Sequence, residues 1–432
     1  MSLRAFLHSR YGRGFASRAQ IEAHHAAALR RFRAQVMPRS PFYRAMAGLQ
    51  PAQLPRMNKT RLMEDFSAIN TCGIQRDHAM EIAIRAESSR DFSPLIGSVS
   101  VGLSTGTSGQ RGLFLATARE RRLWAAIMLG RYWPQLWRRQ RVGFFMRADN
   151  ALYRSMSNAL VRFMFFDLLA PFDAHLPRLQ ALDPTVLIAP AQILAMLARL
   201  QLSGDIALAP RRVISVAETL DTADAALIAR AFGRPVHQVY QATEGVLAMT
   251  CSHGNLHLNE YWLRIERDVI DDRSGAFCPV IHDFTRESLP ILNYRLDDVL
   301  IPDPSPCPCG CASQRIARIE GREDDMLWWP SPTAPRMISA EAVRTAFACL
   351  PCNLRDYRVI QRGKRLHLWL EGADSGAQPA LRDSFAALAR RSGCELPALV
   401  FHAGLPPETG AKRRRIRVEP AASDTGEIPH PR

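Results

Sequence analysis

The feature that most constrains the fold is an alternation of short apolar segments with helical segments through the middle of the chain. The apolar segments are rich in β-branched and aromatic side chains, which is typical of buried strands. The strands predicted in this way are 141–146, 186–188, 213–216 and 236–240, and the helices between them are 191–200 and 223–232. Strands that alternate with helices form a sheet covered by helices, so the sequence predicts an α/β fold.

Other patterns flank this core, and 432 residues exceed what one compact core usually holds. The predicted segments are a helix at 16–35, a β-rich stretch at 255–301 with a turn at 271–275, a helix at 340–348, a strand pair at 357–370 and a helix at 379–391. We therefore predict a large domain at residues 1–321, with a β-rich subdomain, and a small α+β domain at residues 322–432. His24 and His25, on the first of these helices, are expected to be solvated.

Composition and sequence pattern exclude several classes of protein. The residues are 47% hydrophobic and 22% charged, which is ordinary for a globular protein and unlike a disordered or fibrous chain. The N-terminus has no signal-peptide pattern, and no apolar stretch reaches the ~18–20 residues that a membrane span needs. We therefore expect a cytoplasmic protein that does not associate with a membrane.

A glycine-rich loop, Ser104-Thr105-Gly106-Thr107-Ser108-Gly109, separates two apolar runs in the segment 98–117. Successive backbone N–H groups and hydroxyls in such a loop form a concavity that binds phosphates. It is not a Walker A loop, because no Lys-Ser or Lys-Thr follows it, and it does not fit G-x-G-x-x-G. A plain surface turn is the alternative for this loop taken alone. Behind it, Thr117 and Glu120 have the spacing of a capping box, which predicts the start of a helix.

Four motifs together resemble the adenylate-forming superfamily, which contains the acyl- and aryl-CoA synthetases, the luciferases and the adenylation domains of peptide synthetases. They follow the family's order over most of the chain and are the glycine-rich loop, Tyr240-Gln241-Ala242-Thr243-Glu244, Tyr294-Arg295-Leu296-Asp297-Asp298 and Gly321-Arg322-Glu323-Asp324-Asp325-Met326-Leu327. The sequence is most similar to the phenylacetate–CoA ligase-like branch, near the uncharacterised adenylate-forming proteins grouped with capsule-biosynthesis homologues. The resemblance implies a large N-terminal adenylation domain and a small mobile C-terminal domain, with a hinge at 322–325.

The resemblance also implies roles for individual residues. The loop from Ser104 to Gly109 would hold the β- and γ-phosphates of ATP. Asp298 would accept hydrogen bonds from both ribose hydroxyls, because a carboxylate can accept from two donors at once. Ala217 and Glu218 would contact the adenine and the acyl pocket, and Tyr240 and Arg322 would contact the nucleotide. Thr243 would contact a phosphate and Glu244 would bind Mg²⁺. Asp324 would be the hinge residue.

The lysine content sharpens one assignment. Lys and Arg number 56 against 41 Asp and Glu, a net charge of +15, yet the only lysines are Lys59, Lys364 and Lys412. Lys412 ends the segment 407–412, which resembles the closing motif in which this superfamily carries its adenylation lysine. The resemblance implies that Lys412 neutralises negative charge when a carboxylate attacks the α-phosphate of ATP. The arginines at 413–415 are interpreted as a solvated basic tail.

The sequence departs from the family at two of these motifs. Arg111 and Gly112 follow the glycine-rich loop where the family commonly has lysine, which puts one phosphate contact in doubt. The segment before Asp298 lacks the usual Thr-Gly. Asp297 is therefore an alternative to Asp298 as the ribose ligand.

A group of cysteines and histidines indicates a metal. Three of the nine cysteines crowd into Cys307-Pro308-Cys309-Gly310-Cys311, and reduced thiols at this spacing favour a metal over disulfides. Two short ligand pairs far apart in the sequence are typical of a structural Zn²⁺ site, and some phenylacetate–CoA ligase-like proteins carry zinc in a similar arrangement. The predicted ligands are Cys251, His257, Cys307 and Cys309, with His253 and Cys311 as substitutes and buried unpaired thiols as the alternative to zinc.

The resemblance as a whole implies an ATP- and Mg²⁺-dependent ligase. It would activate a small-molecule carboxylate, aromatic or fatty, to an acyl-adenylate and pass the acyl group to a thiol of CoA or of an acyl carrier protein. Two alternatives stay open. The net charge would suit a nucleic-acid-binding protein, although aromatic and basic residues do not interleave and no motif that recognises nucleic acid is present. A degenerate AMP-binding protein without turnover is the other.

Overall fold

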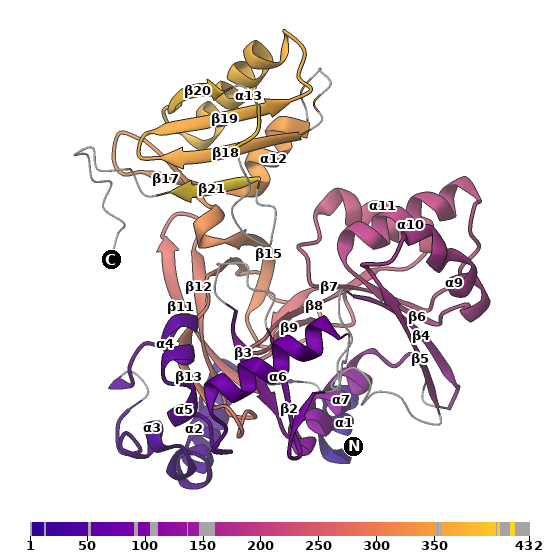
Figure 1. Cartoon of the computed structure of the whole chain (residues 1–432), viewed down its shortest axis with the longest axis vertical. Coiled ribbons are helices and arrows are strands. Elements are labelled where there is room, and N and C mark those ends of the chain that lie inside the picture. The colour runs from indigo at the N-terminus through magenta and orange to yellow at the C-terminus, as the bar shows by residue number, and fades with distance from the viewer. Residues whose placement is uncertain are drawn as a thin grey trace.

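A computed structural model describes most of the chain (Figure 1). The described residues are 2–12, 14–50, 53–89, 94–103, 111–135, 137–146, 160–348, 350, 354, 356–402, 404–406 and 415–419, without the side chains of 341 and 348. The predicted phosphate loop, Ser104 to Gly109, and the predicted adenylation lysine, Lys412, lie outside these residues.

Five parallel strands form one half of a twelve-stranded sheet. In sheet order they are β5 (Val161–Asp167), β4 (Gln140–Met146), β6 (Val186–Ala189), β7 (Arg212–Val216) and β8 (Val236–Ala242). Because helices cover both faces of a parallel sheet, such strands are nearly continuous apolar runs, which is why the sequence pattern located four of the five. β5 was not among the predicted strands.

Helices pack on both faces of this half (Figure 1). Leu179, Leu194 and Ile228 bury one face against Phe145 and Val213. That face carries η3 (Phe172–His175), α9 (Leu176–Leu182), α10 (Ala191–Ser203) and α11 (Thr222–Phe232), and the other carries α1 (Leu3–Tyr11) and α7 (Ala118–Tyr132). The predicted capping box is present at the start of α7, where Thr117 and Glu120 each bond the other's backbone N–H. The α/β fold is therefore confirmed.

The other half of the sheet is antiparallel and contains the predicted β-rich stretch. Its strands, in sheet order, are β9 (Gly245–Thr250), β10 (Leu256–Leu258), β15 (Arg315–Arg322), β14 (Asp298–Asp303), β12 (Ala276–Asp283) and β11 (Leu263–Asp271), with β13 (Ile291–Arg295) paired to β12. β8 and β9 form the antiparallel pair at which the two halves join.

The N-terminal helices and a small sheet cover the antiparallel half. Phe66, Ile69 and Met37, all fully buried, share a core with Phe277 and Ile281 of β12. The elements are α2 (Arg18–Gln35), η1 (Met37–Arg39), α3 (Pro41–Arg44), α4 (Lys59–Glu64), α5 (Phe66–Ile69), α6 (Arg76–Ser88), β1 (Leu95–Ile96), β2 (Val99–Leu103) and β3 (Leu113–Ala116).

The expected solvation of the histidine pair on α2 is wrong for His25. His25 is buried, and its Nε2 lies 2.7 Å from the backbone oxygen of Glu260. Burial lowers the pKa of His25 to about 4. His24 is half-buried and stacks on the ring of Tyr261. The histidine pair therefore anchors α2 to the loop before β11, a contact that the polar neighbours of the pair in the sequence did not indicate.

The C-terminal part folds around a second sheet, with strand order β20-β19-β18-β21 (Figure 1). Its elements are η4 (Glu323–Asp325), β16 (Leu327–Trp329), β17 (Arg336–Ile338), α12 (Ala340–Ala348), β18 (Asp356–Arg362), β19 (Arg365–Glu371), α13 (Ala377–Ser392), β20 (Ala398–His402) and β21 (Ile416–Glu419). Trp329 and Phe385 lie at its centre, and this core continues to Cys278 and Val299 of the large sheet. None of the helices described is long and apolar enough to cross a membrane.

The contact between α1 and α7 gives a stability prediction. A Cβ at Gly130 of α7 would lie 2.6 Å from the backbone oxygen of Phe6 and 2.8 Å from Cβ of Ser9. Alanine adds about 1 kcal/mol of helix propensity, but forcing two backbones apart costs about 1–3 kcal/mol. We expect Gly130→Ala to lower the free energy of unfolding in urea by about 1 kcal/mol and to expose α1 to limited proteolysis.

Gly48→Ala is the matched control, because a Cβ there meets nothing within 4 Å. Its free energy of unfolding should change by less than about 0.5 kcal/mol. Equal stability of the two variants would contradict the close approach of α1 to α7.

Candidate functional site

The predicted nucleotide residues lie where the parallel half of the sheet becomes antiparallel. Ala217 and Glu218 follow β7, and Tyr240 lies near the end of β8. Because neighbouring parallel strands end at the same edge of a sheet, these segments come together there. Ligands of open α/β sheets bind at this edge, where the strand order changes.

A tight turn presents Thr243 and Glu244 at this edge. Ala242 of β8 pairs directly with Gly245 of β9, so the two residues between them form the whole turn. A Cβ at Gly245 would lie 3.1 Å from Oδ2 of Asp283, which leaves little space for any other residue. Arg286 donates a hydrogen bond of 3.1 Å to the backbone oxygen of Thr243 and holds the turn from the side of β12.

Glu244 lies in an environment that disfavours its charged form. The hydroxyl of Tyr294 on β13 donates a hydrogen bond of 2.7 Å to Oε1 of Glu244. Burial nevertheless raises the pKa of Glu244, and the nearby Asp298 adds to this rise. A cation beside this carboxylate would stabilise its charged form. The carboxylate oxygens and this electrostatic environment therefore suit a Mg²⁺ ligand.

Tyr240, Asp298 and Arg322 form a contiguous group. The hydroxyl of Tyr240 donates a hydrogen bond of 2.6 Å to Oδ2 of Asp298, and Nε of Arg322 lies 3.8 Å from Oδ1. Asp298 and Arg322 are paired across β14 and β15, so the sheet register brings them together. Burial, followed by the charge of Asp298, raises the pKa of Tyr240 well above its usual value and keeps it protonated.

The two adjacent aspartates differ in their surroundings. The side chain of Asp297 is 58% exposed and lies 3.8 Å from NH1 of Arg295, whereas that of Asp298 is 24% exposed. Asp298 is the one that contacts Tyr240 and Arg322. The geometry therefore favours Asp298 over Asp297 for the role at the ribose, which stays a prediction.

The segment after β7 is strained. Ala217 has φ +64°, in the left-handed region that a side chain with a Cβ rarely adopts. Oε2 of the next residue, Glu218, accepts a hydrogen bond of 3.2 Å from the backbone N–H of Gln192 at the start of α10. Both residues line the cavity described next.

The predicted hinge residue, Asp324, is exposed on η4.

A cavity of about 2320 Å³ joins these residues to an apolar space between α7 and the sheet. Its charged side is formed by Glu244, Asp298 and Arg322. Its apolar side includes Trp124, Ile127 and Met128 of α7, Phe144 of β4 and Val216 of β7. The cavity thus has a charged compartment beside an apolar compartment.

Lys59 is a cavity residue that the sequence analysis did not select. It is the first residue of α4, and Met57 beside it forms a β-bridge with Tyr294 that fixes this segment at the cleft. Burial lowers the pKa of Lys59, while the nearby Glu244 opposes that shift. The signal that could have found it was present, because Lys59 is one of only three lysines.

Glu120 is a second residue that sequence reasoning used only as a helix cap. Its carboxylate accepts hydrogen bonds from the backbone N–H groups of Thr117, Glu287 and Ser288 and from the Ser288 hydroxyl. Burial opposes ionisation, yet Arg286 and these donors lower the pKa of Glu120 below its ordinary value. Glu120 therefore ties the start of α7 to the loop whose Arg286 holds the Thr243 turn.

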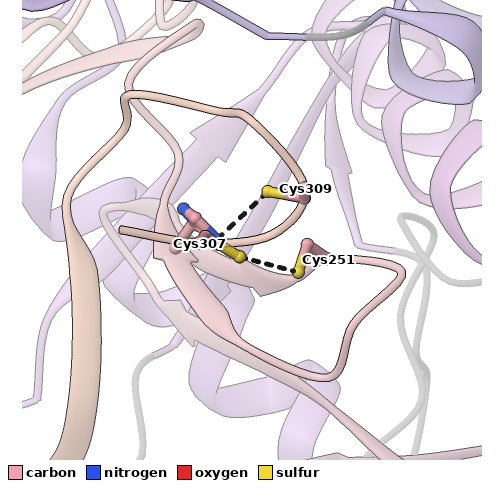
Figure 2. A group of neighbouring side chains, drawn as sticks. Cys251, Cys307 and Cys309 are labelled. Atoms are coloured by element: carbon pink, nitrogen blue, oxygen red, sulfur yellow. Dashed lines mark hydrogen bonds between the residues drawn. The ribbon is translucent and has the colours of Figure 1, made fainter. Parts of the chain in front are cut away.

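The four predicted metal ligands are brought together at a separate place. The ligand atoms of Cys251, His257, Cys307 and Cys309 all lie within 4.8 Å of one another, and Figure 2 shows the three sulfur atoms turned toward a common point. Sγ of Cys251 lies 3.8 Å from Sγ of Cys307, too far for a disulfide. His253 and Cys311, the proposed substitutes, are described and lie outside this group.

No protein-family model matches the sequence, and no curated protein is similar to it in sequence. Solved structures are similar in fold. A 2-hydroxyisobutyryl-CoA ligase in the postadenylation state with 2-HIB-AMP shares 16% identity, with a TM-score of 0.63 over 95% of this chain and 91% of that chain. The same ligase in an open conformation with 2-HIB-AMP and CoA shares 18% identity, with a TM-score of 0.61 over 91% of both chains.

A more distant likeness is to the amide bond synthetase McbA from Marinactinospora thermotolerans, at 14% identity and a TM-score of 0.50 over 71% of this chain and 65% of that chain. At these identities the likeness concerns the fold. The chain has the fold of the adenylate-forming acyl-CoA ligases, which confirms the fold that the sequence motifs implied. The phenylacetate–CoA ligase-like branch stays a prediction.

Asp283, beside the Thr243 turn, gives a pH-dependent prediction. Burial raises the pKa of Asp283 to about 6, although Thr285 donates two hydrogen bonds to Oδ1. Because the folded-state pKa exceeds the unfolded one, the carboxylate destabilises the fold increasingly as pH rises from about 4 to 6. Asp283→Asn should raise the free energy of unfolding by about 1–3 kcal/mol at pH 7.5 and by almost nothing at pH 4.

Denaturant unfolding at both pH values measures this difference. Asp271→Asn serves as the control, because Asp271 is half-buried at a turn and also accepts bonds from a neighbouring backbone N–H and hydroxyl. A benefit of Asp283→Asn that is the same at pH 4 and pH 7.5 would contradict the raised pKa.

Proposed function

We propose that this protein activates a carboxylic acid with ATP, as an acyl-adenylate, and then transfers the acyl group to a thiol. The observation that carries the proposal is the group formed by Tyr240, Glu244, Asp298 and Arg322 at the edge of the sheet, next to an apolar cavity. The related folds support it, because the 2-hydroxyisobutyryl-CoA ligase structures contain an adenylate, and one of them also contains CoA.

The nucleotide would occupy the charged side of the cavity. Asp298 would accept the ribose hydroxyls, with Tyr240 fixing the orientation of its carboxylate through the 2.6 Å hydrogen bond. Ala217 and Glu218 would border the adenine, and Arg322 would approach the nucleotide from β15. Thr243 and the loop from Ser104 to Gly109 would contact the phosphates.

In the first half-reaction a carboxylate oxygen of the substrate forms a bond to the α-phosphorus of ATP. The bond from this phosphorus to the oxygen that bridges to the β-phosphate breaks, and pyrophosphate leaves. Since two anions meet, catalysis depends on positioning and on neutralising charge. Glu244 would hold Mg²⁺, which neutralises phosphate charge when it is bound.

We assign part of this neutralisation to two lysines. Lys59 lies in the cavity within electrostatic range of Glu244 and Arg322. An ammonium group there would compensate phosphate charge on the side of the cleft formed by the N-terminal helices. Lys412 would supply a second cation from the C-terminal segment, with Asp324 as the hinge between residues 1–321 and 322–432.

In the second half-reaction the sulfur of CoA or of a carrier protein forms a bond to the acyl carbon, and AMP leaves. The apolar walls from α7, β4 and β7 support an acid with a largely apolar body, aromatic or fatty, because charged groups there would lose hydration without gaining partners. A pyrophosphate-release assay over aromatic, short-chain and fatty acids, with and without CoA, tests the proposal. No release with any acid would refute it.

The three lysines allow a matched comparison in that assay. Lys59→Met and Lys412→Ala should each lower pyrophosphate release by about 10²-fold or more, since each removes a charge that acts on the transition state. Nucleotide binding should survive in both variants, as measured by calorimetry with AMP. Lys364→Met is the control, because Lys364 is exposed in the turn between β18 and β19. Full activity of Lys59→Met or Lys412→Ala would refute the role of that lysine.

We further propose that Cys251, His257, Cys307 and Cys309 hold a structural Zn²⁺. A tetrahedral site with Zn–S of ~2.3 Å and Zn–N of ~2.05 Å has S···S edges of about 3.8 Å and S···N edges of about 3.5 Å. The Cys251–Cys307 separation of 3.8 Å and the Cys309–His257 separation of 3.6 Å fit these edges. Nδ1 of His257 lies 3.0 Å from the backbone oxygen of Ser313, which leaves Nε2 for the metal.

Such a site would join β9, β10 and the loop before β15. We expect about one Zn²⁺ per chain by elemental analysis, and we expect Cys307→Ala to lose the metal and to lower the melting temperature by several degrees. Cys311→Ala is the control, because Cys311 belongs to the same loop but not to the ligand group. Protein purified without chelators that contains no zinc would contradict the proposal.

A further inference from the structure

A cluster of arginines lies at the edge of the parallel sheet opposite the nucleotide site. We call it the arginine corner, and it consists of Arg10 at the end of α1, Arg131 in the last turn of α7, Arg211 and Arg212 at the start of β7, and Arg234 before β8. The seven residues of β8 span about 20 Å, so the strand separates the corner from the Thr243 turn. The reacting phosphates of the proposed function therefore do not explain it.

The corner contains positive charge that no carboxylate balances. Among the described residues, no aspartate or glutamate forms an ion pair with any of the five. Arg10 donates hydrogen bonds to the backbone oxygens of Trp133 and Pro134, and Arg211 donates to the side-chain oxygen of Gln135. Nη1 of Arg212 lies 3.2 Å from Nε2 of His237. These acceptors are neutral, so they orient the guanidinium groups without cancelling their charge.

Buried polar atoms without a partner gather at the same place. Nε of Arg131, Nε of Arg212 and Nδ1 of His237 have no hydrogen-bond partner in the structure, although His237 is only 5% exposed. Burial, followed by repulsion from Arg10 and Arg234, lowers the pKa of Arg212. An uncompensated charge beside buried polar atoms is unfavourable, so an anion bound next to these arginines would relieve the penalty of the charge.

The corner also has space for a ligand. A depression of about 390 Å³ is lined by Pro134, Gln135, Arg211, Arg212 and Arg234. Three arginines thus line one small volume, and a guanidinium presents paired N–H donors that match two oxygens of a phosphate. Trp137, in the turn that also contains Gln135, is 93% exposed.

We propose that the arginine corner is a second anion site, which binds a phosphate-class oxyanion separately from the nucleotide. The three arginines of the depression would contact its oxygens, and Arg10 and Arg131 would add long-range attraction. The anion would join the start of β7 to the end of α7, whose Ile127 and Met128 wall the apolar cavity. This inference does not rest on the proposed function.

Calorimetric titration of the full chain with inorganic phosphate, at constant ionic strength in chloride, tests the site. The double substitution Arg211→Gln with Arg234→Gln should lower the affinity about tenfold or more, because it removes two charge-assisted contacts. The control is Arg76→Gln with Arg85→Gln, which changes the net charge equally on α6, where both arginines are exposed and paired with carboxylates. It should bind phosphate as the unmodified chain does.

Lys59→Met tests the alternative that inorganic phosphate binds beside Lys59 in the large cavity. Phosphate binding that Lys59→Met retains and the corner variant loses supports the proposal. The proposal is overturned if Lys59→Met loses phosphate binding and the corner variant keeps it. It is also overturned if no phosphate binding is detected in the presence of chloride. In urea without phosphate the corner variant should be at least as stable as the control, because it loses Arg234, which repels Arg212, whereas the control loses ion-paired arginines. This excludes misfolding as the cause of a lost signal.

The phosphate could be free or part of a nucleotide, and a second titration with cytidine monophosphate distinguishes the two. If the nucleotide binds more tightly than phosphate and Trp137→Ala lowers its affinity to that of phosphate, the ligand is a nucleotide phosphate whose base stacks on the exposed ring. Equal affinities of cytidine monophosphate for the unmodified chain and for Trp137→Ala would identify free phosphate. Both results support an oxyanion site, and failure of both ligands to bind at the corner refutes it.

Discussion

The change from parallel to antiparallel pairing at β8 is the constraint on which the candidate site depends. A parallel strand must be followed by a crossover, whereas β8 turns back at once into β9 through Thr243 and Glu244. The turn therefore stands at the carboxyl edge of the parallel strands, while β14 and β15 approach it from the antiparallel side with Asp298 and Arg322. One change of strand direction brings together residues that are far apart in the sequence.

Electrostatics at this edge favour a cation. Glu244, Asp283 and Asp298 lie close together, and burial raises the pKa values of Glu244 and Asp283. The positive charge of Arg286 beside the turn does not offset this rise. The opposite edge has the reverse imbalance, because none of the described aspartates and glutamates forms an ion pair with the five arginines there. Both imbalances would be relieved by bound ions of opposite sign, which is the physical link between the proposed nucleotide site and the proposed anion site.

The sequence predicted four of the five parallel strands and the helices α10 and α11 closely, because strands buried on both faces are apolar throughout and need no tertiary information to be recognised. It also predicted the capping box at Thr117 and the grouping of Cys251, His257, Cys307 and Cys309, because these patterns depend on spacing. It was wrong for His25, because the burial of that ring depends on the loop at Glu260, more than two hundred residues away. Lys59 was missed for the same reason, since its place at the cleft depends on the bridge between Met57 and Tyr294 of β13.

By itself, the sequence determined the α/β fold class, the order of the motifs and the identity of the residues available for chemistry, since local periodicity and residue type encode these properties. The tertiary structure alone decided which residues meet. It brought Asp298 rather than Asp297 to Tyr240, placed Lys59 in the cavity, and gathered five arginines at the far edge of the sheet. These outcomes follow from strand register and long-range packing, because contacts between distant segments depend on how the whole sheet assembles.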